Sequence, residues 1–153
     1  MKESQEAIDL IKKWEGCRLK SYHDVAGIYT IGYGSIFWKD GKKVQPNQII
    51  NLETAEDLLK WEVSKVVKRL NTYELEVNQN QFDAIVSFCY NIGTQGFKLS
   101  TLYKLIKGNP DNPQIESEFL KWNKARINGK LQPVTGLTNR RKDEASLYFK
   151  KLD

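Results

Sequence analysis

The chain has 153 residues, a length that suits one domain with a sizeable core. Apolar residues make up 40% of it and charged residues 28%, fractions that are ordinary for a soluble globular protein, and no stretch approaches the roughly 18 consecutive apolar residues of a membrane span. The net charge of +5 favours an anionic partner such as nucleic acid, an anionic membrane surface or an acidic polysaccharide.

The two cysteines, Cys17 and Cys89, are too few for a disulfide framework, and their spacing matches no zinc motif. We expect two reduced thiols, although the sequence leaves a bridge between them open. Residues 1–6 are charged and lead into an amphipathic segment, unlike a secretory signal. We therefore expect synthesis in a cytoplasm, with no signal peptide and no stable membrane anchor.

The first predicted element is a helix over residues 4–15, which Ser4 caps and Gly16 ends. Its apolar side chains recur at helical spacing: Ala7, Leu10, Ile11 and Trp14. Glu15 then lies on the last turn, at the negative end of the helix dipole. That position favours the protonated carboxyl, which is the form that a general acid needs.

Short extended pieces with glycine between them follow the first helix. Residues 28–31 are rich in strand-forming side chains and come after a turn at 24–27. Asp40-Gly41 is a hairpin signal between residues 36–38 and 42–44. We expect a small antiparallel sheet of two or three strands, which is too small to be stable without helices packed against it.

The rest of the sequence predicts helices. A long helix over 52–71, capped by Asn51, can bridge a small lobe and a larger one. A helix over 79–92 opens with a capping box at 78–81 and is apolar nearly all round from residue 84, as a core helix is. The remaining predicted elements are helices at 100–107 and 113–122, a turn at 128–129, a loop at 133–136 and a last helix at 137–151.

These elements predict one α+β domain over residues 1–153. We expect a β-rich hairpin lobe over about 16–50 and a larger, all-helical lobe made of residues 1–15 and 72–153. The helix at 52–71 would join the two lobes, with a cleft between them.

Three residues of the first 34 suggest a chemistry. Glu15, Asp24 and Thr30 form the pattern E-x8-D-x5-T, which puts a carboxyl at a helix end, a second in a turn and a hydroxyl in a strand. Two carboxyls held on either side of a sugar are what hydrolysis of a glycosidic bond requires. Taken singly, each residue has an ordinary interpretation: a solvated helix-end Glu, a turn Asp and a strand Thr.

The pattern, together with T-I-G-Y-G at 30–34, resembles the active-site signature of the phage-type lysozymes, glycoside hydrolase family 24. Other segments resemble the same family: W-E-G at 14–16, N-Q-F-D-A at 80–84, Y-N-I-G at 90–93, S-T-L at 100–102, W-N-K-A at 122–125 and G-L-T-N-R-R at 136–141, followed by Glu144. Each is weak alone, but their shared order and spacing over about 130 residues is specific.

The resemblance implies a lysozyme-like α+β fold and cleavage of the β-1,4 bond between N-acetylmuramic acid and N-acetylglucosamine in peptidoglycan. Glu15 would give its proton to the glycosidic oxygen, Asp24 would stabilise positive charge or orient a water, and Thr30 would hold that water. We expect inversion, because a group that holds water has little purpose in a covalent mechanism. Retention stays open, since carboxyls about 5–5.5 Å apart would imply it and about 6.5–9.5 Å would imply inversion.

The resemblance also implies substrate-binding residues. Arg140 matches an arginine that faces the catalytic Glu, although a solvated arginine near a helix start is the simpler interpretation. Ile36, Tyr90, Asn91 and Ser100 match positions that contact saccharide. His23, beside Asp24, is interpreted as an exposed loop residue. No metal and no cofactor are expected, because two carboxyls and water complete the reaction.

Two other functions stay open: a lytic transglycosylase, which cuts the same bond with one acid, and a non-catalytic module that binds cell-wall glycan. Nucleic-acid binding is disfavoured, because the lysines are dispersed and no recognition motif is present. The resemblance implies that the partner is bacterial peptidoglycan, that the protein is a monomer, and that it is made in the host cytoplasm and released to the wall with the help of a holin. The positive charge would assist encounter with an anionic wall.

Overall fold

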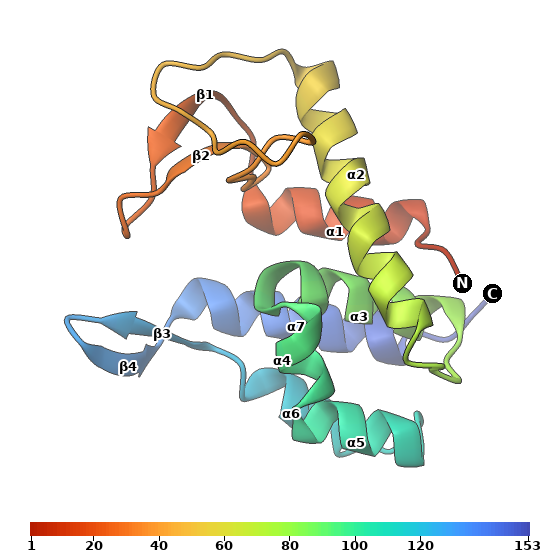
Figure 1. Cartoon of the computed structure of the whole chain (residues 1–153). Helices are drawn as coiled ribbons and strands as arrows, with labels where there is room; N and C mark the ends of the chain where they lie inside the picture. Colours follow the sequence, from red (N-terminus) through yellow and green to blue (C-terminus); the bar gives the residue numbers. More distant parts are fainter. The chain divides into compact units, whose positions relative to one another are not determined.

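The computed structural model describes residues 1–153 as seven helices and two antiparallel β hairpins (Figure 1). The chain divides into two compact units. The inserted unit is Ile11–Lys65, and the split unit is Met1–Leu10 together with Val66–Asp153. Helices α1 (Gln5–Glu15) and α2 (Leu52–Asn71) each contribute residues to both units. No helix has the length and apolar character needed to cross a membrane.

The inserted unit is built on one hairpin. Strand β1 (Arg18–His23) pairs antiparallel with β2 (Tyr29–Gly32), and Tyr22 lies opposite Thr30. A Cβ added at Gly32 would lie 3.6 Å from Cβ of Ala55, so the end of β2 lies directly against α2. The helix therefore supplies the apolar support that a two-stranded sheet lacks by itself. The buried apolar residues of this unit are Ile11, Ile31, Tyr33, Val44, Ala55, Leu58, Leu59 and Val63.

The predicted second hairpin of this unit is present in reduced form. A single antiparallel bridge joins Phe37 and Lys43 around the Asp40-Gly41 turn, and the N–H of Trp38 donates to the carbonyl of Lys42 at 2.9 Å. The chain makes a turn there without regular strands, so the regular sheet has two strands.

The core of the split unit is α3 (Gln79–Ile92), which packs against α7 (Thr135–Phe149). Residues 81–89 are buried without interruption, as the all-round apolar pattern predicts. Asn78 and Gln81 form the predicted capping box. The other helices of this unit are α4 (Thr94–Lys98), α5 (Thr101–Gly108) and α6 (Ile115–Leu120).

The two chain segments of the split unit are held together by polar contacts. The backbone N–H of Ser4 donates to Oδ1 of Asp83 at 2.9 Å, and the Ser4 hydroxyl bonds to the other oxygen of the same carboxylate. Glu6 forms an ion pair with Lys150 at 3.2 Å. The first ten residues thus belong with the second half of the chain.

The α+β class is as predicted, but the lobe expected to be all-helical also carries a hairpin, β3 (Lys124–Ile127) and β4 (Lys130–Pro133). The sequence predicts only its turn, where Asn128 and Gly129 have φ of 51° and 80°, as a two-residue hairpin turn requires. Nearly every strand residue is exposed, so no apolar alternation marks the strands. Helix α4 was not predicted, and α6 is shorter than the expected 113–122.

Candidate active site

Glu15 is the last residue of α1, and Gly16 ends the helix with φ of 67°, as the sequence predicts. The Glu15 side chain is half-buried. A Cβ added at Gly34 would lie 2.8 Å from Oε1 of Glu15 and 3.6 Å from its carboxyl carbon. The carboxyl therefore lies against the backbone of Gly34, four residues beyond Thr30. The end of α1 and the segment after β2 are brought together at this carboxyl.

Asp24 occupies the turn between β1 and β2. Its Oδ1 accepts two backbone hydrogen bonds, from the N–H of Ala26 at 2.8 Å and from the N–H of Ile28 at 2.9 Å. Its own N–H donates to the carbonyl of Ile28 at 3.0 Å. Oδ1 is thus fixed by the turn that it organises, while Oδ2 makes no hydrogen bond within the protein and can accept one from a water or a sugar.

Thr30 lies in β2 and is 5% exposed. Its hydroxyl donates to the carbonyl of Ile28 at 3.1 Å. Because a hydroxyl has one proton, the remaining lone pairs of Thr30 Oγ1 can only accept a hydrogen bond. Thr30 Oγ1 can therefore accept a hydrogen bond from a water, but it has no second proton to donate to that water.

The backbone of Ile28 connects these two residues. Its N–H donates to Asp24, and its carbonyl accepts from Asp24 and from Thr30. The three predicted catalytic residues all lie in the inserted unit, and the turn and strand that carry two of them share one hydrogen-bonded residue.

Arg140 differs from the simpler interpretation of a solvated surface arginine, because its side chain is 4% exposed in α7. Its Nε is 3.2 Å from Oε2 of Glu144, and its Nη2 donates to the carbonyl of Ser87 at 3.1 Å. Arg141, to which the sequence analysis assigned no role, pairs with Oε1 of Glu144 at 2.7 Å. Burial raises the pKa of Glu144, while the two arginines and the hydroxyl of Ser87 act to lower it.

The other predicted substrate-binding residues are divided between the units. Tyr90 and Asn91 are near the end of α3, and Asn91 accepts a hydrogen bond from Arg141 Nη2 at 2.9 Å. The hydroxyl of Ser100 accepts from the N–H of Tyr103 at 3.0 Å and donates to the carbonyl of Phe97 at 2.6 Å. Ser100 thus caps α5 with its hydroxyl. Saccharide contact by these three residues and Arg140 stays a prediction.

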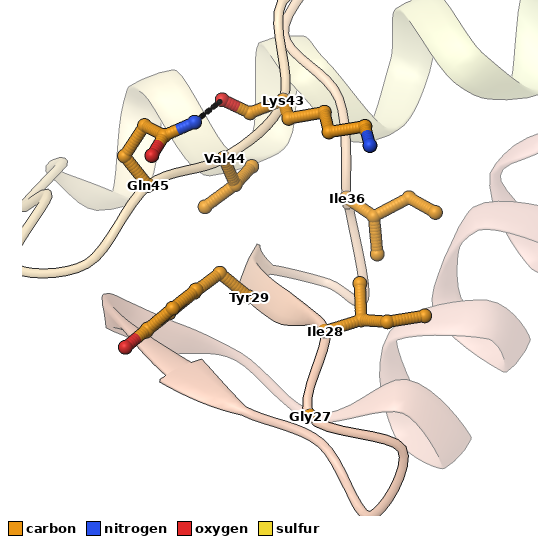
Figure 2. Close-up of a pocket in the computed structure, with 7 residues that line it drawn as sticks. All are labelled: Gly27, Ile28, Tyr29, Ile36, Lys43, Val44 and Gln45. Carbon is orange, nitrogen blue, oxygen red and sulfur yellow. Dashed lines mark hydrogen bonds between the residues drawn. The ribbon is translucent and has the colours of Figure 1, made fainter.

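Ile36 lies in the inserted unit, where it lines a pocket (Figure 2). His23 is exposed, and its ring packs 4.2 Å from that of Tyr29. Both cysteines are free thiols, with Cys17 exposed and Cys89 buried. The chain has no group of three or more His, Cys, Asp or Glu side chains that could hold a metal ion.

Comparison with known proteins identifies what the chain resembles. Residues 12–144 match the family model described as phage lysozyme. An endolysin of Acyrthosiphon pisum secondary endosymbiont phage 1 is 39% identical over 95% of this chain and 96% of its own. An endolysin of Bacillus phage B103 is 43% identical over 97% of this chain, which spans 54% of that longer protein. The solved endolysin from Escherichia coli O157:H7 phage FAHEc1 has a TM-score of 0.90 and 39% identity, and the match covers 97% of this chain and 94% of that one.

Proposed function

This chain belongs to the phage lysozyme family and is a lysozyme-type glycoside hydrolase, and we propose that the bond it hydrolyses is the β-1,4 linkage between N-acetylmuramic acid and N-acetylglucosamine in bacterial peptidoglycan. The observation that carries the proposal is the arrangement of the inserted unit: the Glu15 carboxyl lies against Gly34, and Asp24 and Thr30 are both bonded to Ile28. These are a carboxyl at a helix end and, in the following hairpin, a carboxylate and a hydroxyl whose orientation is set by hydrogen bonds to the backbone.

Glu15 is the proton donor in this proposal. The leaving sugar departs as a neutral alcohol only if its oxygen is protonated as the bond breaks, so the acid must be held in a fixed position. Two features support the role. Glu15 is half-buried at the carboxyl end of α1, and Gly34 leaves room for its carboxyl.

Asp24 and Thr30 hold the attacking water. A water that attacks through a lone pair can donate two hydrogen bonds. Asp24 Oδ2 and Thr30 Oγ1 are the two acceptors for them. Both acceptors are oriented by other bonds: Asp24 by the N–H groups of Ala26 and Ile28, and Thr30 by donation to Ile28. A water bound in this way attacks the anomeric carbon directly and gives one proton to the Asp24 carboxylate, so we propose that the reaction inverts the configuration at that carbon.

The substrate is the peptidoglycan of a bacterial wall, and the enzyme acts as a monomer without a metal or cofactor. We propose synthesis in the host cytoplasm and access to the wall through holin-dependent release. The net charge of +5 supports encounter with an anionic wall.

The test is Glu15→Gln, which removes the proton donor and keeps the size of the side chain. We expect clearing of a wall suspension to fall by about 10²–10⁴-fold while wall binding persists. The matched control is Glu6→Gln, an exposed glutamate on the same helix, which should clear walls at the rate of the unsubstituted protein.

Other outcomes identify the competing functions. Full clearing by Glu15→Gln would contradict the assignment of the acid. Anhydro-sugar ends in the released muropeptides, detected by mass spectrometry, would identify a lytic transglycosylase. Wall binding by the unsubstituted protein without any clearing would identify a glycan-binding module.

A further inference from the structure

A second pocket of the inserted unit lies between the Asp40-Gly41 turn and the start of α2, and it has a volume of about 380 Å³. Its lining comes from those two segments: Trp38, Lys39 and Asp40 from the turn, and Thr54, Asp57 and Leu58 from the helix. It shares no residue with the pocket in Figure 2, and none of the three proposed catalytic residues lines it. The proposed function therefore assigns it no role.

The turn side of this pocket is held in place by hydrogen bonds. The indole N–H of Trp38 donates to Oε1 of Gln48 at 3.1 Å, which fixes the orientation of the ring. The Asp40 carboxylate accepts from the N–H of Lys42 at 2.9 Å. The N–H of Gly41 donates to the carbonyl of Trp38 at 2.9 Å. Because these bonds are internal to the protein, the ring and the turn need little ordering when a ligand binds.

The helix side presents two free polar groups beside an apolar one. Leu58, at 3% exposure, is the one buried residue of the lining. Thr54 and Asp57 are exposed and three residues apart, so their side chains are neighbours on one face of α2. The Thr54 hydroxyl and the Asp57 carboxylate form no hydrogen bond within the protein. Both groups can therefore bond to a ligand.

The charged groups of the turn are also available. The ammonium of Lys39 forms no ion pair within the protein, and the carboxylate of Asp40 keeps one oxygen without a hydrogen bond. The lining thus combines an ammonium donor, carboxylate acceptors and a hydroxyl that can do both, next to one indole ring.

This combination favours a sugar. The C–H groups on the face of a sugar ring pack against the negative face of an indole, and its hydroxyls donate and accept around its edge. An anion is disfavoured, because two carboxylates outnumber one ammonium, and an organic cation would meet that ammonium. A purely apolar ligand would cover polar groups without bonding to them. The volume lies near the lower end of the roughly 300–1,000 Å³ of small-ligand sites.

We propose that this pocket binds an N-acetylated sugar of the wall glycan, as a second attachment site outside the catalytic hairpin. The sugar ring packs on Trp38, its hydroxyls donate to Asp57, and Lys39 donates to the acetyl carbonyl. This inference rests on the proposed function, because it takes peptidoglycan as the polymer that the enzyme meets. Attachment at one point of a long polymer raises the effective concentration of the rest of it at the catalytic residues.

The first measurement detects binding directly, with an N-acetylglucosamine trimer as the probe. It uses Glu15→Gln, so that the probe is not cut, and follows the indole N–H signal of Trp38 by NMR, assigned by its loss in Trp38→Phe. We expect a saturable shift of this signal. Adding Asp57→Ala should abolish the shift, whereas adding Glu53→Ala should leave it unchanged.

The second measurement is clearing of a wall suspension. Asp57→Ala should raise KM about threefold to tenfold with kcat unchanged, as loss of one hydrogen-bonded contact does. Glu53→Ala is the matched control, because it removes the same charge from an exposed position of α2 outside the pocket. Loss of a negative charge by itself would strengthen attraction to an anionic wall, so net charge cannot explain a higher KM.

The results separate this inference from the proposed function. A Trp38 signal that does not shift, a shift that persists with Asp57→Ala, or equal KM values for Asp57→Ala and Glu53→Ala would each overturn the sugar site. An unsubstituted protein that clears no walls, while its Trp38 signal still shifts with the trimer, would contradict the proposed function and leave the sugar site in place.

Discussion

A Cβ atom at Gly34 would lie 2.8 Å from Oε1 of Glu15, closer than a carbon and a carboxylate oxygen approach without displacement. Gly34 also has φ of 88°, in the region that side chains other than glycine rarely adopt. Glycine at this position therefore satisfies two requirements at once, one of the backbone and one of the Glu15 carboxyl.

Gly34→Ala should reduce wall hydrolysis at least tenfold, because the added methyl group displaces the carboxyl that protonates the leaving oxygen, and small misplacements of a reacting group are costly. The measurement is kcat on wall suspensions, with thermal unfolding recorded in parallel.

Gly41→Ala is the matched control for Gly34→Ala. Gly41 has φ of 85° and no atom within 4 Å of an added Cβ, so this substitution carries the same backbone strain, about 1–2 kcal/mol, without touching Glu15. Equal losses of activity in the two variants would show that strain alone is responsible and that the contact with Glu15 has no catalytic importance.

Asp24→Asn and Asp24→Ala should separate the structural role of this carboxylate in the turn from its proposed role in holding the attacking water. Asparagine keeps an oxygen that can accept from Ala26 and Ile28 but removes the charge, so we expect a folded protein of normal stability with activity reduced about 10²-fold or more. Alanine removes the turn bonds as well, and should lower the free energy of unfolding by about 1–2 kcal/mol. Normal activity in the asparagine variant would mean that Asp24 serves only the turn.

Arg141→Met should destabilise the split unit in a pH-dependent way. Arg141 acts to lower the pKa of buried Glu144, so its removal lets burial raise that pKa further. An acid whose pKa is higher in the folded than in the unfolded state loses stability as the pH rises through that interval. We expect a deficit of about 3–5 kcal/mol at neutral pH that shrinks toward pH 4, where Glu144 is protonated and needs no cation.

The measurement for Arg141→Met is the unfolding free energy between pH 4 and pH 8, with Arg69→Met, at an exposed position of α2, as the control. The hydrogen bonds of Arg141 to Asn91 and to the carbonyl of Trp122 are lost at every pH, so they add a constant offset. A deficit that does not change with pH would contradict the coupling to Glu144.

Thiol labelling should distinguish the two cysteines. Burial raises the pKa of the Cys89 thiol well above its ordinary value, so the reactive thiolate is scarce, and the same burial blocks access. We expect iodoacetamide at pH 8 to modify one cysteine in the folded protein, two in denaturant, and none in folded Cys17→Ser. Rapid modification of a second thiol in the folded protein would contradict this burial.

The sequence predicts best those features that depend on contacts between residues close together in the chain, such as helix ends and caps. The end of α1 at Gly16 and the capping box of Asn78 and Gln81 depend on contacts within a few residues, and both are present in the structure. The cap of α5 by Ser100 is equally local, because serine is a preferred N-cap residue, although the predicted helix at 100–107 counts Ser100 as its first residue.

What the sequence does not predict depends on distant pairing. The contact between Glu15 and Gly34 requires a helix end and a hairpin to meet, and no local pattern encodes their separation. The burial of Arg140 is equally non-local, because it depends on Ser87 and Glu144 from the α3 and α7 packing. Strands β3 and β4 were not predicted, because strands exposed on both faces show no alternation of apolar and polar residues.

The division of the chain also sets an order of assembly during translation. All of the inserted unit leaves the ribosome before most of the split unit exists, although the latter includes the first ten residues. The hydrogen bond from Ser4 can form only after Asp83 has been synthesised, and the ion pair of Glu6 can form only after Lys150 has been synthesised. A chain that terminates between residues 66 and 82 therefore retains Glu15, Asp24 and Thr30, but its N-terminal segment lacks the contacts with Asp83 and Lys150.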